Sequence, residues 1–169
     1  MMVLMVGCSN NEEPVTEEPK VHIPALRASL EDAKFNWDVL TTDPHTESLH
    51  ELHDVTEETV GDEFFYNVTA GENIELTLTQ NNIREKLAKA ALQMPIEGSN
   101  SEQFFTAVTL LLQSTQPIIN EEGRTTIIQE LGIEPSAVYD NINSTYDTKS
   151  TFYSLQVIED NLVFAIEPK

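Results

Sequence analysis

The sequence predicts an α+β domain, with an antiparallel sheet and helices packed on one of its faces. The clearest strand is residues 73–79, where apolar and polar residues alternate strictly, as in a strand with one buried and one wet face. The clearest helix lies within residues 99–117, where apolar residues recur at helical spacing. Two apolar runs at 151–158 and 162–166 indicate a closing hairpin. Strands on either side of a helical block are typical of this fold class.

The first expected element is a helix that begins at Pro24, a residue suited to the first helical turn. Its apolar face is spaced by steps of four and three residues: Leu26, Leu30, Ala33, Trp37 and Leu40. Residues 35–37 could equally be extended. Further along, Ser48 with Glu51 resembles a capping box, which predicts a short acidic helix.

Two strands are expected next, at 63–68 and 73–79, joined by a turn at 70–72. A helix is then predicted, capped by Asn81 or Asn82 and ended by Pro95. Its apolar stripe would consist of Ile83, Leu87, Ala90, Ala91 and Met94. No internal repeat is visible along the chain.

Two more helices have clear end signals. Ser99 and Glu102 form a capping box for the most apolar helix of the chain, which we expect to be central. Asn120 is a good N-cap for the next helix, and Gly132 suits the position after its end. A short helix from Pro135 is a further option.

The N-terminal residues resemble the cleavage site of a bacterial lipoprotein precursor. The lipoprotein pattern has a leucine-like residue, a small or aliphatic residue, Gly or Ala, and then the modified cysteine, and Met5-Val6-Gly7-Cys8 fills these four places. An acidic, proline-bearing stretch follows it. The resemblance implies that residues 1–7 are the remnant of a signal peptide and that 8–22 are a lipidated cysteine and flexible tether, with the globular domain at 23–169. An unprocessed N-terminus with a free thiol is the alternative.

The resemblance also implies a location and a partner. Acyl chains on Cys8 would hold the protein on the outer face of the cytoplasmic membrane, and the tether is similar to those of Gram-positive lipoproteins. No stretch of the sequence approaches the ~20 apolar residues that a membrane-spanning helix needs. The membrane is therefore one expected partner, through the lipid, and an unknown protein or cell-envelope component is the other.

Charge limits the remaining partners. The chain carries 29 acidic and 9 basic residues, a net charge of −20. Such a surface repels phosphate backbones, so we expect no nucleic-acid partner. The acidity either attracts cations and basic partners or simply keeps the surface solvated and the protein soluble.

One segment has the composition of a metal site. On a helix over residues 47–54, imidazoles and carboxylates would share one face and could bind a divalent cation such as Zn²⁺. The candidate ligands are His45, Glu47, His50, His53 and Asp54. The alternative is a solvated acidic helix whose histidines face water.

Other motifs are missing from the sequence: there is no nucleophile elbow, P-loop, dinucleotide fingerprint or EF-hand loop. We therefore expect a non-catalytic binding domain of a surface lipoprotein, with no cofactor. A lipoprotein that binds a divalent metal through residues 45–54 is the alternative.

Overall fold

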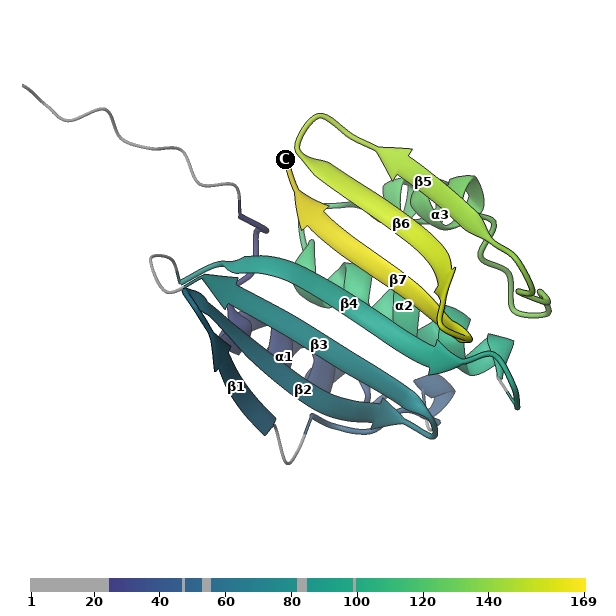
Figure 1. The fold of residues 1–169 in the computed structure, drawn as a ribbon, viewed down its shortest axis with the longest axis horizontal. Helices are drawn as coiled ribbons and strands as arrows, with labels where there is room; N and C mark the ends of the chain where they lie inside the picture. The colour runs from purple at the N-terminus through teal and green to yellow at the C-terminus, as the bar shows by residue number, and fades with distance from the viewer. Residues whose placement is uncertain (1–24, 47, 53–55, 82–84, 99) are drawn as a thin grey trace, which may run out of the picture.

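The computed structural model describes residues 25–46, 48–52, 56–81, 85–98 and 100–169. Within these ranges it has one seven-stranded sheet and three α-helices (Figure 1). The strand order is β1-β2-β3-β4-β7-β6-β5, and every neighbouring pair is antiparallel. The predicted α+β class and antiparallel sheet are therefore confirmed.

The strands are β1 (Thr56–Val60), β2 (Glu63–Gly71), β3 (Ile74–Asn81), β4 (Leu87–Pro95), β5 (Asn143–Asp147), β6 (Thr151–Ile158) and β7 (Asn161–Pro168). The helices are α1 (Leu30–Leu40), α2 (Ser101–Thr115) and α3 (Glu121–Leu131), with a short 3-10 helix, η1 (Pro44–Thr46), after α1. In Figure 1 the three α-helices lie behind the sheet, with α2 between α1 and α3.

The start of the first helix differs from the prediction. α1 begins at Leu30 rather than Pro24, because Ser29 accepts a hydrogen bond from Asp32 N and forms a capping box with it. Leu26 is buried before the helix, in an extended segment whose backbone N–H donates to the carbonyl oxygen of Leu87 (2.7 Å). Residues 35–37 are helical, so the extended alternative is wrong.

The helix predicted between Asn81 and Pro95 is wrong, because the structure places strand β4 at Leu87–Pro95. The predicted cap Asn82 and the stripe residue Ile83 lie outside the described residues. Its buried residues Ala90, Leu92 and Met94 alternate as a strand requires. The pairing of β3 with β4 shifts register between Thr79 and Gln80, and this irregularity brings Leu87 to a buried position three residues before Ala90. The step of three residues from Leu87 to Ala90, followed by the step of four from Ala90 to Met94, imitates the period of a helix.

The other two helices agree with the sequence. α2 is capped by Asn100, whose side chain accepts from Gln103 N; the predicted cap, Ser99, lies outside the described residues. α3 is capped by Asn120 and ends at Gly132, whose φ of 72° is left-handed. The residues after Pro135 form a turn, so the short helix considered there is absent from this described segment.

The sheet has an approximate two-fold arrangement that the sequence does not reveal. α1 is followed by the meander β1–β4, and α3 is followed by the meander β5–β7. The last strands of the two meanders, β4 and β7, pair antiparallel at the centre of the sheet. α2 lies behind this central pair in Figure 1, and its side chains form much of the core.

Candidate functional site

The segment predicted to bind a metal is only partly described. His45 lies in η1 and His50 lies in the chain that follows it. The other three predicted ligands, Glu47, His53 and Asp54, lie outside the described residues.

The helix expected from Ser48 is not present in residues 48–52. Leu49 forms a β-bridge with Gly71 at the end of β2, and His50 N donates to the carbonyl oxygen of Ala70 (2.9 Å). On the other side, Trp37 Nε1 of α1 donates to the carbonyl oxygen of His50 (2.9 Å). This stretch is therefore an extended strap between α1 and the sheet, and it does not have the helical spacing on which the metal prediction rested.

The strap is held by a further hydrogen bond. Leu52 N donates to Asp38 Oδ1 (2.7 Å), and the side chain of Leu52 is buried. Among the described residues, no group of three or more His, Cys, Asp and Glu side chains is arranged to hold a metal ion. Because three of the five predicted ligands are not described, divalent-metal binding stays a prediction.

A groove of about 560 Å³ lies where the C-terminal end of α1 and η1 meet α2. Its walls are formed partly by apolar side chains, including Val39, Leu40 and Phe105. Asp43 and His45 line the same groove. The volume falls within the range of ~300–1,000 Å³ that is usual for ligand sites in proteins.

Local hydrogen bonds build the η1 side of the groove. Asp43 Oδ1 accepts from His45 N (2.9 Å), which fixes the turn introduced by Asp43-Pro44. The hydroxyl of Thr46 donates to the carbonyl oxygens of Asp43 (2.7 Å) and Leu40 (3.1 Å), so Thr46 is satisfied although it is largely buried. These bonds fix the backbone of η1, so that the exposed residue His45 lies in the wall of the groove.

The α2 wall is less polar than its sequence indicates. The hydroxyls of Thr106 and Thr109 donate to carbonyl oxygens of their own helix, at 2.9 Å each. These donors are thus already used, and Phe105 and Leu110 add apolar surface beside them. The groove can hold an apolar segment, with an imidazole and a carboxylate at its η1 end.

Exposed apolar side chains adjoin the groove. Phe35 is 69% exposed and Val39 is 52% exposed, and they lie one helical turn apart on α1. The helical period of the sequence places Ala33, Trp37 and Leu40 on the core face and does not reveal this pair. Two large apolar residues at a four-residue spacing, off the core stripe, were the signal that could have found it.

No known family model, curated protein or solved structure matches this chain. None of the described helices is both long and apolar enough to cross a membrane.

Proposed function

We propose that this protein is a lipid-anchored surface protein whose domain, residues 23–169, binds a partner and performs no chemistry of its own. In this proposal the domain is a single unit whose helices all cover one face of the sheet. The observation that supports it best is the α1–α2 groove together with the exposed Phe35 and Val39 beside it. Apolar side chains exposed next to a concave surface are typical of interaction sites.

The partner we propose is a protein that lays the apolar face of a helix, flanked by basic residues, into this groove. A groove between two helices suits a helical ligand with apolar anchors on successive turns. The net charge of −20 favours a basic partner and increases the rate of encounter. Asp43, at the η1 end of the groove, offers a carboxylate to such a partner.

Cross-linking on living cells tests this proposal. A photoreactive amino acid placed at Thr42 of the anchored protein, an exposed residue that lines the groove, should capture one reproducible partner. Phe35→Glu and Val39→Glu should each reduce that capture at least tenfold, while the free energy of unfolding changes by no more than about 0.5 kcal/mol because both side chains are exposed.

Val138→Glu is the matched control, because Val138 is also apolar and is 82% exposed away from the groove. It should leave capture unchanged. Equal loss of capture in all three variants, or no reproducible product from the probe at Thr42, would remove the groove as the binding site.

The anchor is tested separately. The N-terminal peptide of protein recovered from cells should begin at Cys8 and carry the mass of a diacylglyceryl group. An unmodified peptide that still contains Met5-Val6-Gly7 would remove the anchor from the proposal but leave the binding domain.

The second candidate is divalent-metal binding through residues 45–54, which the shared position of Asp43 and His45 in the groove favours. A metal that binds only the folded state raises the free energy of unfolding by about 2.7 kcal/mol at a hundredfold excess over its Kd. Zn²⁺ should raise the stability of the native chain and not of a His50→Ala, His53→Ala double variant. Identical stability in Zn²⁺ and in chelator would end this candidate.

A further inference from the structure

A second concave site lies just beyond the C-terminal end of α2. A pocket of about 330 Å³ is lined by the C-terminal end of α2, the first turns of α3 and the turn between β5 and β6. It shares no lining residue with the α1–α2 groove. We propose that this pocket binds a small organic carboxylate.

A buried side-chain amide without a hydrogen-bond partner, that of Gln116, indicates that the pocket binds a ligand. The side chain of Gln116 lines the pocket and is 3% exposed, yet its Nε2 has no hydrogen-bond partner among the described residues. A buried polar group without a partner usually costs ~1–3 kcal/mol, so such groups are uncommon outside functional sites. Because Nε2 is a donor, the ligand that satisfies it must present an acceptor oxygen.

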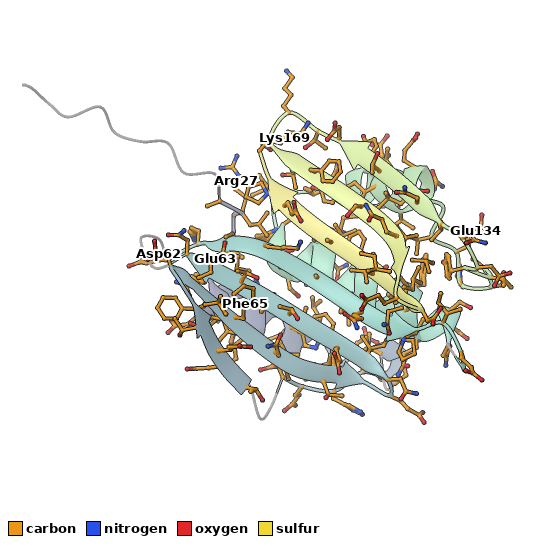
Figure 2. The ribbon with its side chains drawn as sticks, viewed as in Figure 1. Arg27, Asp62, Glu63, Phe65, Glu134 and Lys169 are labelled. Carbon is orange, nitrogen blue, oxygen red and sulfur yellow. The ribbon has the colours of Figure 1, made fainter. Side chains whose placement is uncertain are left out.

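Arg27 supplies a positive charge to the same pocket. The extended segment before α1 alternates, with Leu26 and Ala28 buried and both hydrogen-bonded to the backbone of Leu87, so the side chain of Arg27 points the other way. Figure 2 shows Arg27 projecting near the C-terminal end of β7. Among the described residues, no hydrogen bond or ion pair occupies its guanidinium.

The charge balance of the pocket is opposite to that of the protein. None of the described residues that line it is acidic, in a chain with 29 acidic residues. The nearby Asp147 is paired with Lys169 (2.9 Å) and is not part of the lining. One guanidinium and no carboxylate in the wall favour an anion, and Arg binds a carboxylate with good geometry.

The rest of the lining suits a compact organic body. Ile119 and Ile127 are apolar, and Tyr153 adds a buried ring whose pKa is raised by burial, so that its hydroxyl stays neutral. Ser150 and Thr151 contribute hydroxyls at the β5–β6 turn. The volume is at the lower end of the ~300–1,000 Å³ range for ligand sites, which points to a small molecule rather than a polymer.

Titration with benzoate, followed by NMR, tests this proposal on the whole chain. Benzoate should shift the Gln116 side-chain amide resonances saturably. Arg27→Gln and Gln116→Met should each weaken its Kd at least tenfold, with the Kd of every variant read from the backbone amide of Gly123, which also lines the pocket. Gln116→Met keeps the shape of the side chain but removes the unpaired amide, so it should fold without loss of stability and still bind benzoate at least tenfold more weakly.

Lys34→Gln is the matched control, since it removes one positive charge from α1 outside the pocket. It should leave the benzoate Kd unchanged, and benzyl alcohol, which lacks the carboxylate, should bind at least tenfold more weakly than benzoate. Equal binding of the two compounds, an equal effect of Lys34→Gln, or no saturable shift at Gln116 would each overturn the proposal.

Discussion

At the scale of single residues, two threonines on β3 differ in whether their hydroxyl groups have a hydrogen-bond partner. Thr77 and Thr79 both point away from the core face occupied by Leu76 and Leu78. The hydroxyl of Thr77 donates to Asn67 Oδ1 (2.7 Å), whereas that of Thr79, on a residue only 3% exposed, has no partner among the described residues.

Valine at these two positions should therefore have opposite effects. Thr79→Val should raise the free energy of unfolding by about 1 kcal/mol, because it removes an unpaired buried hydroxyl. Thr77→Val should lower it by about 1 kcal/mol, because it leaves Asn67 without its donor. Urea denaturation of the two variants measures both changes, and a loss of stability in both would show that the Thr79 hydroxyl has a partner in solution.

Trp37 should be one of the most sensitive core positions. It is fully buried, and its Nε1 holds the strap at His50. Trp37→Phe should lower the free energy of unfolding by about 2–4 kcal/mol, because it leaves a cavity and an unpaired carbonyl oxygen. Guanidinium denaturation measures the change, with Phe35→Leu on the exposed face of α1 as the control that should change little. Similar losses in the two variants would contradict the assigned burial.

The helical period was sufficient to predict that Trp37 is a core residue, but not what it binds. The Trp37 indole meets the backbone of His50 only because the strap crosses α1 to reach Gly71. Such a contact depends on tertiary structure and leaves no spacing in the sequence. For the same reason, no pattern in the sequence indicates that Phe105 of α2 lines the same groove as His45.

At the scale of elements, β4 shows where local pattern and tertiary structure disagree. Residues 85–94 are rich in good helix formers, and the register shift near Thr79 produces a helical step between Leu87 and Ala90. The strand forms because β3 and β7 pair with it on both sides. Leu92, fully buried and off the predicted helical stripe, was the residue that a period of two would have found.

The edge strands were missed for a different reason. Every residue of β1 is exposed, so Thr56–Val60 has no buried face and no alternation to detect. β5, at the other edge, alternates only between exposed and half-buried residues. The carboxylates of Glu57 and Glu58 on β1 help to keep this edge from pairing with another chain.

The capping box of α1 should titrate in a characteristic way. Hydrogen bonds with Ser29, and then the charge of Lys86, hold the pKa of Asp32 below its usual value. Because the folded-state pKa is depressed, the stabilisation is present above the ordinary Asp pKa of ~3.9 and is lost as the pH falls through the folded-state value.

Carboxyl NMR titration should show Asp32 ionising at lower pH than an ordinary aspartate, and Ser29→Ala should move its pKa upward. Lys86→Gln should produce a smaller shift in the same direction, because Ser29 is the larger cause. An unchanged Asp32 titration in Ser29→Ala would mean that the capping box does not form in solution.

At the scale of the whole molecule, the fold class was predictable, but the strand pairing that joins the two halves of the sheet was not. The alternation in β3 and the β6–β7 hairpin both depend on residues close together in the sequence. In the hairpin, the two strands are joined by a two-residue turn, Glu159 and Asp160, both with positive φ. The pairing of β4 with β7 joins segments on opposite sides of the helical block. No short-range pattern specifies that pairing, so the two-fold arrangement appears only in the structure.

The proposed anchor gives a prediction for the whole protein. Expressed behind a complete lipoprotein leader, wild-type protein should fractionate with membranes, whereas Cys8→Ser should be released from them. The isolated Cys8→Ser protein should unfold at the same urea concentration as delipidated wild-type protein, since Cys8 lies in the proposed tether. Membrane association that survives Cys8→Ser would show that something other than the acyl group holds the protein.

The backbone pairing of Leu26 with Leu87 has a consequence for how an anchored domain would stand. The described chain enters the fold where β4 begins, and Lys169, beside Ser150, lies at the same end of the central strands. The eleven residues of α1 then run about 16 Å from there toward η1. In the proposed anchored protein, the tether would therefore join the domain beside Arg27 and the Gln116 pocket, and the α1–α2 groove would lie at the far end of α1 from that junction.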